Sequence, residues 1–132
     1  MEIKSKNSSN RMGDFRRNIL ESASFDYAMA AKIANETGSL AAYRSVEALL
    51  DSFEFTLDAG TEAKKDVSRE KETILNEKRE RMQRYEQEKQ RLGFFERQDI
   101  ERSMERDIEI DAVGRRLQNC WDVANKRGLF ND

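Results

Sequence analysis

The sequence contains no proline, no histidine and a single cysteine, Cys120, and each absence argues against a class of structure or activity. Without proline, no residue forces a helix to kink or end by steric conflict. Without histidine, the commonest general base and metal ligand is missing, which argues against most acid–base enzymes and against a four-helix di-iron protein in its usual form. One cysteine cannot form an intramolecular disulfide or a multi-cysteine zinc site.

The chain also lacks a long apolar run. No stretch approaches about 18 consecutive apolar residues, and the polar start has no apolar segment, so we expect neither a membrane span nor a secretory signal. The 24 basic and 26 acidic residues nearly cancel, so the whole protein has no field that would attract nucleic acid or an anionic membrane. The composition therefore predicts a cytoplasmic protein, or one inside a larger assembly.

What the sequence does contain is helical periodicity interrupted by glycines. With 132 residues, 37% of them apolar and 38% charged, the chain is long enough for one domain with a modest core. Apolar residues at steps of three and four predict helices over about 11–37, 40–59, 62–92 and 95–127 within a single domain of residues 11–132, after a flexible polar arm over 1–10. Gly38, Gly60 and Gly93 separate the helices, and Ser39 and Thr61 suit the N-caps of the second and third.

These elements predict an all-α fold of four helices, two of moderate length followed by a long antiparallel, coiled-coil-like hairpin that turns at Gly93. In the third helix, Lys71 and Lys78 interrupt a narrow apolar sector. In the fourth, the apolar residues before and after Glu109 project from nearly opposite sides. We favour a continuous fourth helix with two different neighbours over a break at Gly114, because one glycine costs only about 1 kcal/mol relative to alanine. The first two helices are then predicted to pack on the start of the third helix and the end of the fourth.

The second half of the fourth helix is the candidate partner-binding surface. Its apolar residues face away from the side predicted to contact the third helix, so another surface has to cover them. Either the first two helices cover them, which places Trp121 in the core, or another chain does, most simply a second copy of this one. The candidate residues, to which the second helix adds an outlying phenylalanine, are Ile110, Val113, Leu117, Trp121 and Phe55.

A second candidate set is basic and lies on the third helix: Lys78, Arg79, Arg81, Arg84 and Arg91. These side chains could bind nucleic-acid phosphates together with the N-terminal arm, but acidic residues are interleaved with them. Arg115 and Arg116 form a smaller basic spot with the same ambiguity. A solvated helix whose charges pair with one another is the simpler interpretation.

No residue pattern predicts catalysis, a cofactor or a metal. Cys120 is predicted as a buried structural thiol, because no histidine is present to lower its pKa. Glu101, Glu105 and Glu109 could offer oxygen ligands to a divalent cation, but we interpret them as a solvated acidic face.

We therefore expect a non-enzymatic helical interaction protein: an adaptor, an assembly or secretion-type chaperone, or a small structural subunit of a larger complex such as a virion or secretion machine. The alternative is a nucleic-acid-binding accessory factor of a phage or mobile element that uses the basic positions and the N-terminal arm. The expected partner is a protein or a second copy of the chain, with no cofactor and no insertion into a membrane.

Overall fold

The computed structural model describes the backbone of residues 2–131 and the side chains of residues 11–93 and 104–131. The described backbone forms four helices and no strand: α1 (Glu2–Thr37), α2 (Tyr43–Phe55), α3 (Glu62–Gln90) and α4 (Phe94–Lys126). The predicted all-α, four-helix fold class is confirmed, whereas the coiled-coil geometry of the α3–α4 hairpin stays a prediction.

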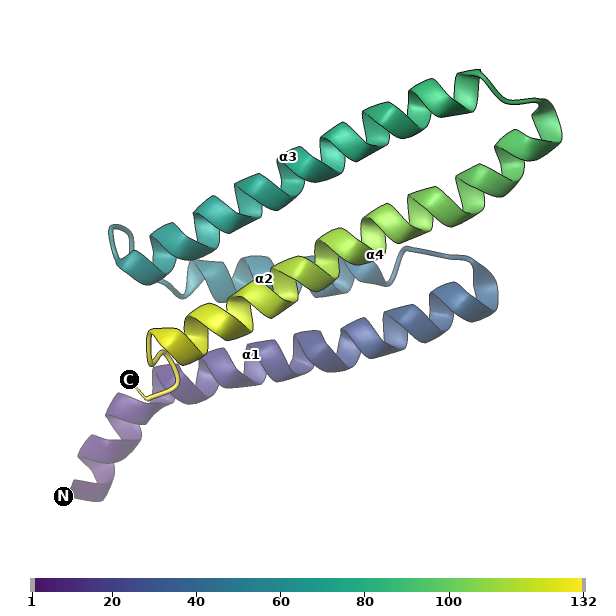
Figure 1. Cartoon of the computed structure of the whole chain (residues 1–132). Coiled ribbons are helices and arrows are strands. Elements are labelled where there is room, and N and C mark those ends of the chain that lie inside the picture. The colour runs from purple at the N-terminus through teal and green to yellow at the C-terminus, as the bar shows by residue number, and fades with distance from the viewer. Residues whose placement is uncertain (1, 132) are drawn as a thin grey trace.

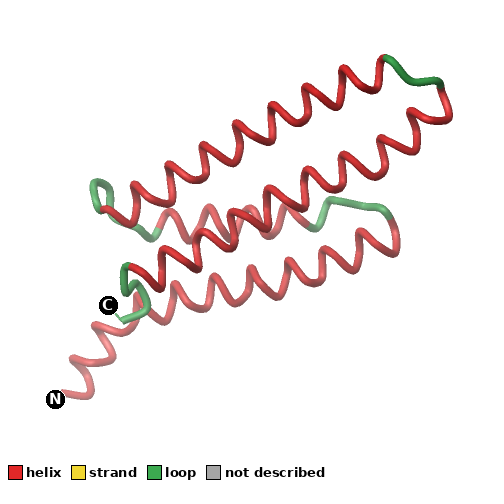
Figure 2. Tube along the Cα trace, viewed as in Figure 1, coloured by secondary structure: helices red, strands yellow, loops and turns green. Residues whose placement is uncertain are grey.

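The helices are arranged as two antiparallel pairs, and the pairs pack together mainly through α4. Figure 1 shows α1 beside α2 and α3 beside α4, and α4 also packs against both α1 and α2. In the described part of the chain α1 and α3 are not in contact with each other, so α4 lies between them. Short loops join the helices, as Figure 2 shows.

The helix-ending signals in the sequence are confirmed at two of the three glycines. Gly38 and Gly60 have φ angles of 76° and 85°, the left-handed region that glycine enters without strain. Thr61 is the N-cap of α3, and its hydroxyl accepts a hydrogen bond from the Lys64 amide (3.2 Å). Gly93 lies between α3 and α4, where it has a φ of −68° and is the N-cap of α4.

α1 is longer than the sequence predicts. It begins at Glu2 instead of about residue 11, because no glycine or proline precedes Gly13 to interrupt the helix. A helical backbone therefore covers the segment predicted as an arm, and Figure 1 shows these first turns extending past the other helices. With 36 residues, α1 is not a helix of moderate length.

α2 is shorter than predicted, with 13 residues. Ser39 does not cap it, because the Ser39 hydroxyl accepts the Ala41 amide (3.3 Å) within a preceding turn, and Ala42 is the N-cap. At the other end, the Arg16 guanidinium donates to the backbone carbonyl and the hydroxyl of Thr56 (3.1 and 3.3 Å). A residue of α1 thus satisfies the carbonyl of Thr56, the C-cap residue of α2, and α2 ends before Gly60.

The core lies where α1 and α2 meet the start of α3 and the end of α4, as predicted. α3 contributes only Ala63 and Val67 to this core, whereas α4 contributes residues over most of its second half. α4 is continuous through Gly114, which is the alternative the sequence favoured. The helical spacing of Ile100, Met104 and Ile108 predicts that they face α3 from the first half of α4. In the structure Ile108 is buried, Met104 is 37% exposed, and the Ile100 side chain lies outside the described residues.

Two glycines let other parts of the chain approach closely. A Cβ atom at Gly114 would lie 2.7 Å from the hydroxyl oxygen of Tyr27, so a side chain there would collide with α1. A Cβ atom at Gly13 would overlap the backbone carbonyl of Phe130, so the C-terminal segment rests directly on α1. These contacts hold α4 and the segment after it close to α1.

Charged side chains from three helices meet beside the core. Asp51 of α2 accepts hydrogen bonds from Arg116 of α4 (2.8 Å) and from Lys71 of α3 (3.1 Å). Lys71 also lies 3.8 Å from Glu54, which pairs with Lys64 (3.5 Å). The Arg116 side chain is only 7% exposed. The interpretation of Arg116 as part of a surface basic spot is therefore wrong, and Lys71 joins α3 to α2 where the sequence showed only an interruption.

The cluster changes the pKa of its central carboxylate. Burial alone would raise the pKa of Asp51, but the hydrogen bonds from Arg116 and Lys71 lower it, and the net result lies below the ordinary value of 3.8. Asp51 is therefore ionised throughout the neutral range and stabilises the buried guanidinium of Arg116.

We predict that the two members of the Asp51–Arg116 pair contribute unequally to stability. Asp51→Ala leaves a buried guanidinium without its main partner, so it should lower the free energy of unfolding by about 2 kcal/mol. Arg116→Met removes the buried charge and leaves Asp51, which is 55% exposed, beside Lys71, so it should cost less than about 1 kcal/mol. Urea denaturation followed by circular dichroism measures both values.

The contribution of Asp51 should also depend on pH. Because its pKa is lower in the folded state than in the unfolded state, its stabilisation is complete above the unfolded pKa and is lost as the pH falls through the folded pKa. The difference in stability between the wild type and Asp51→Ala should therefore shrink below pH 3.8. An Arg116→Met variant less stable than Asp51→Ala, or a difference that persists unchanged into acid, would contradict this assignment.

Candidate partner-binding groove

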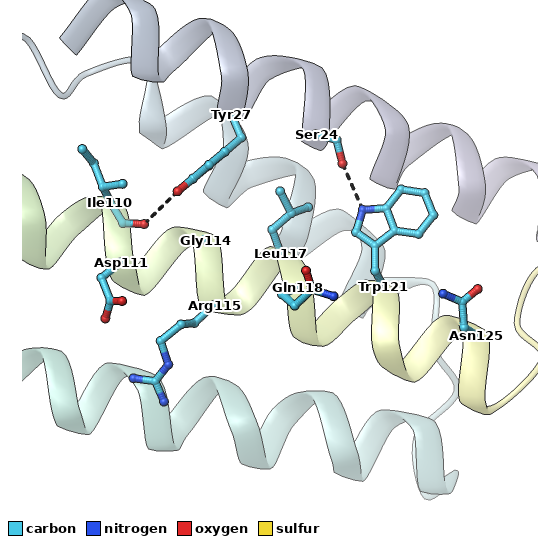
Figure 3. Close-up of a pocket in the computed structure, with 10 residues that line it drawn as sticks. All are labelled: Ser24, Tyr27, Ile110, Asp111, Gly114, Arg115, Leu117, Gln118, Trp121 and Asn125. Atoms are coloured by element: carbon cyan, nitrogen blue, oxygen red, sulfur yellow. Dashed lines mark hydrogen bonds between the residues drawn. The ribbon is translucent and has the colours of Figure 1, made fainter. Parts of the chain in front are cut away.

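An open groove of about 710 Å³ lies between α1 and the C-terminal half of α4 (Figure 3). α4 forms its floor through residues at steps of three and four, which share one face of a helix. From residue 110 to residue 125 this floor is about 22 Å long at 1.5 Å per residue. The lining residues are Ser24 and Tyr27 of α1 and Ile110, Asp111, Gly114, Arg115, Leu117, Gln118, Trp121 and Asn125 of α4.

Trp121 is half-buried at one end of the groove, where contacts with α1 and the C-terminal segment fix its position. Its indole N–H donates to the Ser24 hydroxyl (2.9 Å), as Figure 3 shows. Its ring meets the Phe130 ring edge to face, with centroids 5.6 Å apart, and the Arg17 guanidinium lies 4.8 Å from the centroid of Phe130. The part of the indole that these contacts leave exposed lines the groove.

Tyr27 lies farther along the groove and connects α1 to the backbone of α4. Its hydroxyl donates to the carbonyl of Ile110 (3.3 Å), and its ring packs edge to face on Tyr43, with centroids 5.7 Å apart. Burial, and to a smaller extent the nearby Asp111 carboxylate, raises the pKa of Tyr27 above its ordinary value of 10.0. The phenol therefore stays protonated and neutral at physiological pH, and the absent side chain of Gly114 leaves room for it.

The charged residues of the groove point from α4 toward α3, where each has a partner. Asp111 accepts a hydrogen bond from Arg81 (2.9 Å), and Arg115 donates to Glu77. The hydrogen bond to Glu77 raises the pKa of Arg115, which remains a cation. Because these charges are paired with residues of α3, the groove offers mainly apolar surface and the neutral amide groups of Gln118 and Asn125.

The five residues predicted as a partner-binding surface separate into three positions. Ile110, Leu117 and Trp121 line the groove. Val113 is 2% exposed on the core side of α4, and Phe55 is 88% exposed on α2, away from the groove. α1 and α2 thus cover part of the apolar face of α4 and leave a groove beside α1. Trp121 contacts Ser24 and Phe130 and also lines the groove. Its role in binding a partner stays a prediction.

The five basic residues predicted on the third helix, of which Arg91 is the C-cap residue of α3, do not form one surface. Lys78 and Arg81 are bound to carboxylates of α4 (2.8 and 2.9 Å), and Arg79 donates to Asn76 (3.0 Å). Arg84 and Arg91 are exposed. At 3.6 residues per turn, the five positions spread over about 240° around the helix. The binding of nucleic acid by these residues stays an untested alternative.

Sequence reasoning missed the residues that α1 contributes to the groove. Ser24 and Tyr27 belong to a helix whose partner cannot be read from its own periodicity. Gln118 and Asn125 continue the helical spacing of the floor, which is the one signal that could have identified them.

Cys120 lies in the core, 3% exposed, and outside the groove. Burial raises the pKa of its thiol from 9.0 to about 12, so the reactive thiolate is scarce at neutral pH. Among the side chains that the structure describes, no group of histidine, cysteine, aspartate or glutamate residues could hold a metal ion. Glu109 pairs with Lys78 (2.8 Å), and the Glu101 side chain is outside the described set. None of the described helices is long and apolar enough to span a membrane.

Compared with protein-family models, with curated proteins and with solved structures, the chain matches none. The groove is therefore interpreted from its own geometry.

We predict that Trp121 supports the fold as well as the groove. Trp121→Ala removes the contacts with Ser24 and Phe130 and should lower the free energy of unfolding by about 3 kcal/mol, the low end for truncation of a tryptophan, because the side chain is only half-buried. Trp121→Phe keeps an aromatic ring and loses the N–H donor, so it should cost about 1 kcal/mol. Urea denaturation compares the variants, and a Trp121→Ala variant as stable as the wild type would show that the side chain does not hold α1.

We also predict that Cys120 is unreactive in the folded protein. A thiol with a pKa of about 12 has about a thousandfold less thiolate near pH 8 than one with a pKa of 9.0, so labelling by a disulfide reagent should be slower than in urea by at least that factor. A Ser45→Cys variant, whose new thiol is on the exposed side of α2, is the control that should react in the folded state. Rapid native labelling of Cys120 would contradict the buried assignment.

Proposed function

We propose that this chain is a non-enzymatic helical interaction protein that binds an amphipathic helix of a partner protein in the groove between α1 and α4. The observation that carries the proposal is a half-buried tryptophan, Trp121, held in place on the floor of a preformed groove. Tryptophan is enriched among the residues that contribute most to protein–protein binding, and a side chain already fixed by its neighbours loses little conformational freedom on binding.

The shape of the groove favours a helix as the occupant. A floor about 22 Å long matches about four helical turns. Its apolar lining, with Ile110 and Trp121, suits the apolar side chains that a partner helix presents at i, i+3, i+4 and i+7. The exposed Gln118 suits the polar flank of such a helix, and Asp111 and Arg115 already have partners on α3.

The chemistry of the chain supports a binding role over catalysis. The sequence has no histidine, and its one thiol has a pKa of about 12 inside the core. A role as an adaptor, an assembly or secretion-type chaperone, or a small structural subunit, in the cytoplasm or inside an assembly, fits these properties.

The test is site-specific photo-crosslinking in cells that express the protein naturally. A photoreactive phenylalanine analogue replaces Gln118, an exposed groove residue, and in a matched control it replaces Ser45 on the exposed side of α2. We expect an adduct at position 118 that is weak or absent at position 45. The attached peptide, identified by mass spectrometry, should have the apolar spacing of an amphipathic helix.

A synthetic peptide of the crosslinked segment then gives an affinity. Trp121 is the single tryptophan, so its fluorescence reports directly on occupation of the groove. Binding that shifts this fluorescence and weakens in Gln118→Arg supports the proposal. Equal crosslinking at positions 118 and 45, or a salt-sensitive shift of random DNA or RNA that is lost in Arg84→Glu, would contradict it, and the second result would favour the nucleic-acid alternative.

A further inference from the structure

The side of α1 that faces away from the bundle is partly apolar. α1 packs on α2 and α4 through Leu20, Ala23 and Ala30, and Figure 1 shows it at one edge of the molecule. On its opposite side, Phe25 is 65% exposed and Phe15 is 54% exposed. We call this side the outer face of α1. It spans residues 11–36 within a sector of about 100° at 3.6 residues per turn.

The residues of the outer face are arranged symmetrically about the point between Ala23 and Ser24. Ser22 and Phe25 are equally distant from that point, and so are Asn18 and Met29, which is 43% exposed. When two copies of such a face meet in antiparallel orientation, each large apolar side chain meets a smaller or polar one. Phe25 then covers Ser22 of the other copy, and Met29 covers Asn18.

The charges at the ends of the outer face are complementary in the same orientation. Arg11 near one end and Glu36 near the other are also symmetric about the midpoint, and both are exposed. Antiparallel pairing therefore places Arg11 opposite Glu36 of the second copy twice in one dimer, whereas parallel pairing would place like charges together.

We infer that the outer face of α1 binds the same face of a second copy of this chain, with the two helices antiparallel about a two-fold axis at the level of Ala23 and Ser24. The outer face is about 38 Å long and one helix wide, so the interface is small and the dimer is in reversible equilibrium with the monomer. We expect a dissociation constant on the order of 10 µM. This inference does not depend on the proposed function, because the groove is on a different side of α1.

Sedimentation equilibrium on the full chain tests the dimer, with charge reversal as the specific probe. Arg11→Glu and Glu36→Arg should each raise the dissociation constant by about tenfold, because each creates two like-charge contacts per dimer. The double variant restores opposite charges at both contacts and should return to within about threefold of the wild type. Both residues are exposed, so circular dichroism should show unchanged helices in all three variants.

A matched pair of phenylalanine variants distinguishes binding through the outer face of α1 from nonspecific association through any exposed apolar residue. Phe25→Asp should raise the dissociation constant by at least about a hundredfold, whereas Phe55→Asp, which changes an 88% exposed phenylalanine on α2, should leave it unchanged. A wild type that stays monomeric to about 1 mM would overturn the inference. A double charge variant as weak as the single variants, or a dimer lost in Phe55→Asp and kept in Phe25→Asp, would also overturn it.

Discussion

The C-terminal half of α4 has to pack against all three other helices at once, and the rest of the structure depends on this constraint. Gly114 leaves space for Tyr27 of α1, and Arg116 reaches Asp51 of α2. On the third side, Arg127 binds Asp66 at the start of α3 (2.8 Å). Apolar side chains bury the surface between these contacts, while the polar ones define the position of each neighbour. The C-terminal half of α4 thus has contacts on three sides, and its remaining side forms the floor of the groove.

The two surfaces that we assign to binding share α1 but use different sides of it. One side of α1 forms a wall of the groove through Ser24 and Tyr27, and the outer face carries Phe15 and Phe25. A dimer formed through the outer face would leave both grooves accessible. It would then present two sites for partner helices, and binding to both at once would increase the apparent affinity without any new contact. Such a bivalent arrangement suits a protein that assembles or bridges other chains.

Local signals in the sequence predicted the number and order of the helices better than the residues at which the helices begin and end. Gly38, Gly60 and Thr61 act within one turn of the backbone, so their roles are readable from sequence, as is the change of apolar face in α4. At the early end of α2, the C-cap carbonyl of Thr56 is satisfied by Arg16, a residue of another helix about 40 positions away, and no local pattern reports this contact. Which lysines and arginines pair across helices also depends on the three-dimensional register. For the same reason the sequence indicated the floor of the groove, on α4, and missed the wall that α1 forms.

Native-state hydrogen exchange tests the central claim, that the C-terminal half of α4 is one continuous segment stabilised by all its neighbours. If so, the amides of residues 113–120 exchange only through global unfolding, at the same free energy as the amide of Leu50 in the core. The amide of Arg84, in the part of α3 beyond the shared core, exchanges faster through local opening. Residues 113–120 exchanging as fast as Arg84, or Arg84 exchanging as slowly as Leu50, would contradict the claim.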